Sequence, residues 1–234
     1  MEWRPFSPEY LLEVLPVLFP FLGVTLTVTV GTIVFGSLLG GLLAWAGKSR
    51  SRLLAVLSRG YIYIIRCTPS IVLLFIVFYG LPKFCLEVLE TDINAYDKIF
   101  FVLVSFTLLF AAPISEVMRS AWEAIERGQY EAAVSIGLSP GQAFFHIVLP
   151  QAAVVALPNF GNAVINLMKE GALAYTIGLV DMIGKGQLII SHNYGAYALE
   201  TYLALAAIYL VLTVGVEKLC RYLERSFSPP RSAA

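Results

Sequence analysis

Long runs of apolar residues, each bounded by charged or turn-forming residues, recur five times along the chain. A helix of about 20 apolar residues crosses the roughly 30 Å hydrocarbon layer of a bilayer. The first run, Phe19 to Ala46, contains no charged residue. The fourth is expected to be broken or extended near 169–171. The runs predict an all-α polytopic membrane protein with spans at about 19–46, 60–82, 98–119, 152–182 and 199–219.

Basic residues are unevenly divided between the connections that join these runs. One side receives ten of the sixteen Lys and Arg residues: Lys48, Arg50, Arg52, Arg59, Arg119, Arg127, Lys218, Arg221, Arg225 and Arg231. The other side receives four: Arg4, Lys83, Lys98 and Lys185. The positive-inside rule places the richer side in the cytoplasm. We therefore expect the N-terminus outside and the C-terminus inside, as an odd number of spans requires.

Composition supports a membrane protein and argues against several other classes. Apolar residues make up 58% of the chain and charged residues 14%, against about 25% charged in soluble domains, and the mean hydropathy is +0.77. A formal net charge of zero gives a nucleic-acid partner no electrostatic support. The three cysteines and two histidines, Cys67, Cys85, Cys220, His146 and His192, show no metal-ligand spacing. We expect no metal site.

The runs divide the chain into three parts. Residues 1–18 are expected to form an external, interfacial segment interrupted by Pro16. Residues 19–222 form the membrane domain, and residues 223–234 a cytoplasmic tail. In the first span, Gly36 and Gly40 are spaced for close helix packing in lipid.

The connection 128–150, between the third and fourth spans, predicts two short helices outside the membrane. A first helix over 122–136 ends at Gly137, which suits the left-handed position after a helix. The run 139–142 (Ser-Pro-Gly-Gln) predicts an N-cap, a proline at the first helical position and an S-x-x-Q capping box. The second helix is expected to stop before Pro150. The connection is therefore predicted to be a helical hairpin.

Apolar residues on this hairpin require something to cover them. They are Ala132, Ala133, Leu138, Phe144 and Phe145. Composition alone leaves two interpretations open: the hairpin packs under the bundle, or it docks onto another protein.

The hairpin also carries a spaced motif. Glu131-Ala132-Ala133, Gly137, Ile147 and Leu149-Pro150 follow the pattern E-A-A-x₃-G-x₉-I-x-L-P. This resembles the EAA loop of permease subunits of type I ATP-binding-cassette (ABC) importers. The run from 128 to 139 is similar to the polar amino acid branch of that family. The resemblance implies a MetI-like fold with cytoplasmic coupling helices in a bacterial plasma (inner) membrane.

Other segments extend the resemblance over nearly the whole chain. Residues 66–69 (Arg-Cys-Thr-Pro) resemble the family's R-G-T-P signature, with Cys67 in place of glycine. Residues 115–120 resemble S-E-x-x-R-G, with Ser120 in place of glycine. Residues 169–173 correspond to K-D-T-S-L, with a carboxylate kept and both hydroxyls lost.

The resemblance implies a role for each motif residue and a set of partners. Glu131 would pair with a basic group of a cytoplasmic ATPase, Ala132 and Ala133 would permit close approach, and Gly137 would make the turn. The remaining motif residues of the coupling loop are Ile147, Leu149 and Pro150. The implied partners are an ATPase homodimer that uses ATP-Mg, a second permease (a copy or a related chain) and an external amino-acid-binding protein.

The chain itself is not expected to bind ATP or to be an enzyme. Gly47-Lys48-Ser49 resembles the end of a P-loop, but Leu42 stands where its first glycine belongs. Lys48 is interpreted as a positive-inside anchor. No nucleophile–base pattern is present elsewhere in the sequence. We therefore predict no catalytic residues and no bound cofactor.

Three charges lie within or next to the apolar runs. A basic residue at mid-bilayer costs roughly 2.5–3.5 kcal/mol. Arg66 would be an interfacial anchor or interhelical contact, or part of a pathway. Lys169 and Glu170 lie about 100° apart on a helix, which fits either structural pairing or a broken helix lining a watery path. With Thr68, these residues form the candidate translocation pathway.

The leading hypothesis is the permease of an amino acid importer. Residues 176–182, with Lys185 and Gln187, are similar to cystine-type permeases, so L-cystine is the favoured substrate and other polar amino acids are the alternatives. A secondary transporter or channel would predict internal repeats and no docking loop. A membrane scaffold or receptor would not need the charges at residues 66, 169 and 170.

Overall fold

The computed structural model describes residues 5–227, and every regular element in that part of the chain is helical. The α-helices are α1 Pro8–Leu18, α2 Leu22–Gly47, α3 Arg52–Cys67, α4 Ser70–Phe75, α5 Leu81–Leu89, α6 Lys98–Glu123, α7 Arg127–Ser135, α8 Pro140–Ala143, α9 Leu149–Glu170, α10 Met182–His192 and α11 Ala198–Phe227. Short 3₁₀ helices cover Phe19–Phe21 (η1) and Gly171–Ile177 (η4), and π-helical turns cover Ile76–Gly80 (η2) and Phe144–Val148 (η3).

Five helical stretches in the described residues are long and apolar enough to cross a membrane: Pro8–Gly47, Ser70–Leu89, Lys98–Glu123, Pro140–Ile177 and Ala198–Phe227. The all-helical class and the number of candidate spans are therefore confirmed. The predicted break near residues 169–171 is also confirmed, since α9 ends at Glu170 and the chain continues as the 3₁₀ helix η4.

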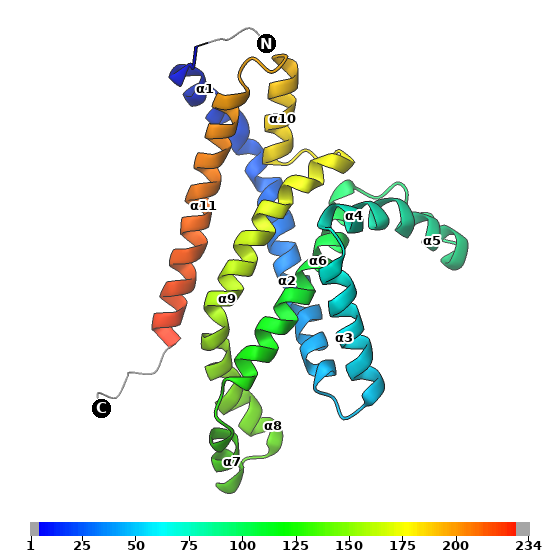
Figure 1. Ribbon diagram of the computed structural model, residues 1–234, viewed down its shortest axis with the longest axis vertical. Helices are drawn as coiled ribbons and strands as arrows, with labels where there is room; N and C mark the ends of the chain where they lie inside the picture. The colour runs from blue at the N-terminus through cyan, green and yellow to red at the C-terminus, as the bar shows by residue number, and fades with distance from the viewer. Residues whose placement is uncertain (1–4, 228–234) are drawn as a thin grey trace.

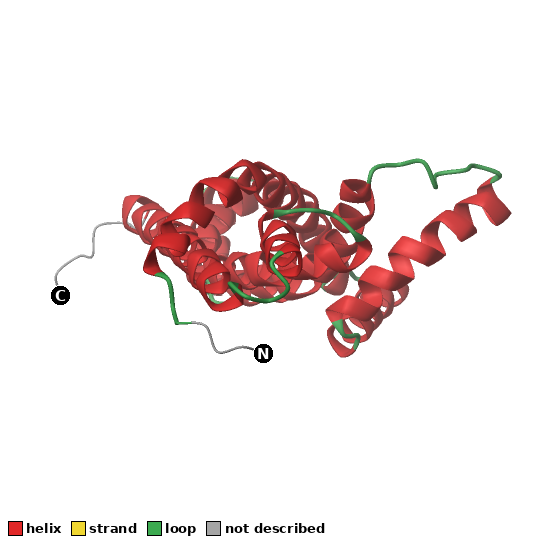
Figure 2. Cartoon of the chain, turned by 90° about the horizontal axis from the view of Figure 1, so that it is seen from above, coloured by secondary structure: helices red, strands yellow, loops and turns green. Residues whose placement is uncertain are grey.

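The long helices run roughly along one axis, and the described chain begins and ends at opposite ends of it (Figure 1). The short helices α7 and α8 lie at the end where α11 finishes, whereas α1 and α10 lie at the other end. Viewed from above, the α4–α5 arm projects to one side of the bundle (Figure 2). We call the two ends the hairpin end and the α10 end.

The helix expected over 60–82 is interrupted, which corrects the prediction of one continuous element. Helix α3 ends at Cys67 and α4 starts at Ser70, in a different direction (Figure 1). Thr68 is extended, with φ −92° and ψ 125°, because the ring of Pro69 disfavours the helical region for the residue before it. The apolar run alone did not reveal this change of direction.

The tight contact in the bundle is between α2 and α6, and glycines make it possible. A Cβ built on Gly36 would lie 2.8 Å from Cδ1 of Phe110, and one on Gly40 would lie 2.9 Å from Cγ2 of Ile114. Small residues let helices approach closely in this way. The interpretation of Gly36 and Gly40 as packing positions is confirmed.

The helix that enters the fourth span does not stop before Pro150, so that prediction was wrong. The π-helical turn Phe144–Val148 precedes the proline, and the Leu149 N–H donates to the carbonyl oxygen of Phe144, five residues back. A wider turn accommodates a residue that lacks an N–H. The turn Ile76–Gly80 stands at the same distance before Pro82. In both places the helix continues through the proline.

Candidate functional site

The hairpin between α6 and α9 forms the surface at the hairpin end of the molecule (Figure 1). Its first part differs from the prediction of one helix over 122–136. Helix α6 ends at Glu123, and α7 begins at Arg127 after a short connection. The break follows from the extended backbone of Glu126, whose ψ is 129°. Helix α7 is therefore free to take its own direction.

The turn after α7 has the conformation that the sequence predicted. Gly137 has φ +97°, a region that residues with a side chain rarely adopt. The Leu138 N–H donates to the carbonyl oxygen of Ala133 (3.2 Å), and the Gly137 N–H donates to that of Val134 (3.0 Å). These two hydrogen bonds are those of a Schellman motif. The left-handed conformation predicted for Gly137 is confirmed.

The second helix of the hairpin starts at the predicted capping box. The Gln142 N–H donates to Oγ of Ser139 (3.3 Å), and the Ser139 N–H donates to Oε1 of Gln142 (2.9 Å). Pro140 is the first helical residue. The two caps fix the angle between α7 and α8 through local hydrogen bonds.

Part of the hairpin's apolar surface is covered within the chain. Ala133 and Ala143 are buried, and the Phe144 ring lies 5.0 Å from that of Trp122 at the end of α6. For Ala133 and Phe144, the first of the two interpretations, packing within the chain, is therefore correct. The hairpin folds back onto α6, which the sequence pattern did not reveal.

A different part of the hairpin is exposed. Ile136 and Phe145 are 80% and 64% exposed, and Glu131 and Ala132 are also exposed. Of the remaining motif residues, Leu149 and Pro150 are exposed and Ile147 is half-buried. Apolar side chains held on a capped turn, beside a carboxylate that forms no ion pair within residues 5–227, are features of a protein-binding surface. We call Glu131, Ala132, Ile136 and Phe145 the coupling surface.

Lys48, which resembled a P-loop lysine in sequence, braces the base of the hairpin. Its Nζ lies 3.3 Å from Oε1 of Glu123 and 4.4 Å from the centroid of the Trp122 ring. Arg119 pairs with Glu123 at 2.6 Å. The lysine follows a long helix rather than a strand, so its surroundings do not resemble a phosphate site.

A cavity of about 460 Å³ opens where the α3–α4 junction meets α6 and α9. We call it the polar groove. Its polar lining consists of Arg66, Thr68, Ser70, Asn159, Asn162, Asn166 and Glu170. The apolar wall includes Leu109, Phe110, Pro113 and Val117 of α6. The interruption at Pro69 brings the Arg66 region beside the last turn of α9.

The polar groove contains charges of both signs. The Ser70 hydroxyl donates to Oε1 of Glu170 at 3.1 Å, whereas the Thr68 hydroxyl donates to the carbonyl oxygen of Ile64 at 2.8 Å. Among residues 5–227, no ion pair joins Arg66 to Glu170. An unpaired guanidinium and a carboxylate in one cavity are complementary to a zwitterion.

Three of the four predicted pathway residues line this groove, and three further residues were missed. Lys169 is exposed and does not line the groove, because the neighbouring Glu170 is the residue of this pair that faces it. Asn159, Asn162 and Asn166 were missed although their spacing places them on one face of a helix. The repeated asparagine in an otherwise apolar run was the available signal.

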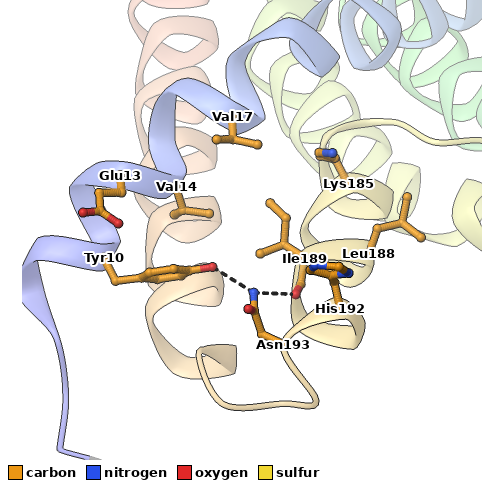
Figure 3. Close-up of a pocket in the computed structure, with 9 residues that line it drawn as sticks. All are labelled: Tyr10, Glu13, Val14, Val17, Lys185, Leu188, Ile189, His192 and Asn193. Carbon is orange, nitrogen blue, oxygen red and sulfur yellow. Dashed lines mark hydrogen bonds between the residues drawn. The ribbon is translucent and has the colours of Figure 1, made fainter.

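A second cavity, of about 510 Å³, lies at the α10 end between α1 and α10 (Figure 3). Asn193 Nδ2 donates to the Tyr10 hydroxyl and to the carbonyl oxygen of Ile189, both at 3.0 Å. The Tyr10 ring also stacks on that of Tyr197, with centroids 3.6 Å apart. These contacts hold α1 against the α10–α11 connection.

The five apolar helices, the protruding hairpin and the polar groove among the helices define a polytopic transport subunit. Residues 36–229 match the family described as "Binding-protein-dependent transport system inner membrane component". The chain belongs to this family.

Relatives and solved structures agree with the family. The chain is 37% identical over 222 residues to the L-cystine transport system permease protein TcyL of Bacillus subtilis (strain 168), covering 95% of this chain and 92% of the relative. A chain in the crystal structure of an amino acid ABC transporter with histidines matches with a TM-score of 0.80 and 28% identity, over 95% and 100% of the two chains. A chain of the inward-facing MetNI methionine ABC transporter matches with a TM-score of 0.70 over 96% and 100% of the chains, and its 19% identity supports the fold alone.

These findings confirm the class predicted from the sequence. The protein is an amino acid ABC importer permease of the type I, MetI-like fold, and a multi-pass inner membrane protein. Members of this family are transport subunits rather than enzymes. The family favours this function over a secondary transporter, a channel or a membrane scaffold.

Proposed function

We propose that this chain is the pathway subunit of an ATP-driven importer, with its N-terminus outside and its hairpin and C-terminus in the cytoplasm. Basic residues that the positive-inside rule counts lie near the hairpin end, on the α2–α3 connection, on α7 and on the last turns of α11 (Figure 1). In a bilayer this distribution favours the hairpin end inside.

The coupling surface is proposed to dock in a groove of a cytoplasmic ATPase. Glu131 would pair with a basic group there, Ala132 would allow close approach, and Ile136 and Phe145 would enter apolar pockets. Ala133 and Gly137 act inside the hairpin, one by packing and one by turning the chain. Because the two caps make the hairpin rigid, it can transmit a movement of the ATPase to α6 and α9. This capped, exposed turn is the observation that carries the proposal.

The proposed assembly contains two permeases, two ATPases and one external binding protein. The second permease is a copy of this chain or a related chain. The ATPases hold ATP-Mg and supply the energy, and the permeases bind no cofactor. Nucleotide-driven closure of the ATPases would shift the pathway between its two orientations.

The polar groove is proposed to contact the amino acid during passage. Arg66 would face the α-carboxylate, since a guanidinium binds a carboxylate through two parallel hydrogen bonds. Glu170, held by Ser70, would face the α-ammonium group. The asparagine side chains on α9 would offer hydrogen-bond donors and acceptors that replace the water lost from the amino acid.

L-cystine is the proposed substrate, with other polar amino acids as the alternatives. The relative TcyL, described as an L-cystine permease, is 37% identical to the chain over 222 aligned residues. Uptake of labelled L-cystine should exceed that of arginine, histidine and glutamine when the matched binding protein is present. If unlabelled L-cystine fails to compete with the uptake of a labelled amino acid, L-cystine is not the substrate. That result would leave the proposed permease function unaffected.

Co-purification tests the docking proposal. The tagged permease should retain a soluble ATPase through washing, and Glu131→Arg should reduce the retained amount about tenfold, as expected for the loss of a charge-assisted contact. Glu217→Arg is the matched control, because Glu217 is exposed on α11 and pairs only with the nearby Arg221 in the described structure. Equal retention by both variants would rule out Glu131 as a docking residue.

A further inference from the structure

A second groove, of about 410 Å³, adjoins the polar groove along α3. We call it the arginine groove. Its lining consists of Arg59, Ile62, Tyr63, Arg66 and Cys67 of α3, with Glu116 of α6. Arg66 lines both grooves. The two cavities therefore share Arg66 in their lining.

The two arginines lie at different heights along α3. Arg59 and Arg66 are seven residues apart, so they share one face of α3 and are separated by about 10 Å along its axis. Arg59 is the nearer of the two to the hairpin end, where α3 begins (Figure 1). Its Nε donates to the carbonyl oxygen of Ala55 at 3.0 Å, which holds the side chain along the helix.

The charge in the arginine groove is net positive. Among residues 5–227, neither Arg59 nor Arg66 has a carboxylate oxygen within 4.0 Å. The carboxylate that lines the groove, Glu116, accepts hydrogen bonds from Nε and from a terminal nitrogen of Arg119, at 3.2 and 2.7 Å. Because Arg119 neutralises Glu116, both groove arginines remain available for an anion.

We propose that the arginine groove is a second carboxylate-binding station, on the cytoplasmic side of the polar groove. The α-carboxylate of the amino acid moves from Arg66 to Arg59 as the substrate leaves the polar groove. The proposal rests on the importer function and on the orientation proposed above. A guanidinium at each station replaces water around the carboxylate, so that the charge crosses the span without being fully desolvated.

A purely topological role for Arg59 leads to different expectations. A positive-inside anchor acts during insertion and makes no contact with the substrate. In that case Arg59→Gln would lower the amount of inserted protein and leave the uptake per inserted molecule unchanged. At a carboxylate station the same change lowers the uptake per molecule.

The first experiment measures ATP-driven uptake by the assembled importer in vesicles, using labelled cystine, arginine, histidine and glutamine. Arg59→Gln should reduce the uptake per inserted permease about tenfold, the size expected for the loss of one charge-assisted hydrogen bond. Arg59→Lys should retain at least half of the wild-type rate. The matched control is Arg52→Gln, which removes the same charge from the same helix outside both grooves and should stay within twofold of wild type.

The second experiment uses Cys67, whose exposed thiol lines the arginine groove. In the background Cys85→Ala and Cys220→Ala, the rate at which N-ethylmaleimide alkylates Cys67 reports on occupancy of the groove. The transported amino acid should slow this reaction at least threefold, and Arg59→Gln should abolish the protection. L-cystathionine replaces L-cystine here, because the Cys67 thiolate would attack the disulfide of L-cystine, forming a mixed disulfide and releasing cysteine.

The outcomes separate this inference from the proposed function. Lack of ATP-driven uptake by the wild-type importer would overturn the proposed function and this inference together. Normal uptake by Arg59→Gln, or alkylation of Cys67 that the transported amino acid does not slow, would overturn the second station alone. Reduced uptake by Arg59→Gln with loss of protection supports it.

Discussion

The turn that carries the coupling surface can be perturbed by substituting Gly137. The free-energy cost of such a substitution to the permease's own backbone can be estimated. Gly137 has φ +97°, and a Cβ built on it meets no atom of residues 5–227 within 4 Å, its chain neighbours aside. Gly137→Ala would therefore cost the backbone penalty alone, about 1–2 kcal/mol. That penalty lowers the equilibrium constant for forming the native turn by a factor of about 5–30. No steric term from the permease itself adds to it.

Gly137→Asp distinguishes strain in the backbone of the turn from contact between the turn and the ATPase. Aspartate tolerates positive φ better than alanine does, so in the permease alone it should disturb the hairpin less. If the ATPase covers the turn, however, the larger charged side chain should disturb docking more. We expect Gly137→Asp to insert normally, to leave ATP hydrolysis by the complex intact and to reduce amino acid uptake at least tenfold.

The assay compares ATP hydrolysis and labelled uptake in the same vesicle preparation. The ratio of uptake to hydrolysis should fall further for Gly137→Asp than for Gly137→Ala. Wild-type uptake by the Gly137→Asp permease would refute the docking of this turn. If the ratio of uptake to hydrolysis falls further for Gly137→Ala than for Gly137→Asp, the loss of uptake is instead caused by strain in the backbone of the turn.

Three further predictions follow from the contacts of the groove, the bundle and the hairpin. Glu170→Gln keeps an oxygen for the Ser70 hydroxyl but loses the charge, so labelled uptake should fall about tenfold; an unchanged rate would exclude a role for this carboxylate. Gly40→Ala should destabilise the protein in detergent by about 1–3 kcal/mol, because its Cβ would lie 2.9 Å from a neighbouring side chain and 3.1 Å from a backbone oxygen. The control, Gly41→Ala, makes only a 3.5 Å contact, so equal melting temperatures for the two variants would contradict this packing. Ser139→Ala removes an N-cap worth about 1 kcal/mol and should speed proteolysis within the hairpin, whereas unchanged proteolysis would show that the cap does not hold it.

Features that depend on a few adjacent residues could be predicted from the sequence. The Schellman turn at Gly137 and the capping box at Ser139 follow from local backbone chemistry, which is the same in any fold. The number of spans follows from the cost of placing charge in hydrocarbon. These predictions required no knowledge of which helices pack against one another.

Features that depend on other helices could not be predicted in the same way. Burial of Ala133 is set by the direction in which the hairpin folds back, and the lining of the polar groove is set by the change of direction at Pro69. The asparagines of α9 carry no charge, so they contribute little to a search for intramembrane charges. Their role became visible only when α3 and α6 were placed around them.

ATP-driven uptake by a defined complex is the direct test of the importer function. The permease would be reconstituted in vesicles with its ATPase and the matched binding protein, and labelled cystine, arginine, histidine and glutamine would be supplied on the binding-protein side. We expect at least one of these amino acids to accumulate only when ATP is present on the ATPase side. Accumulation driven by an ion gradient without the ATPase, or no ATP-dependent accumulation of any of the four, would contradict the importer function.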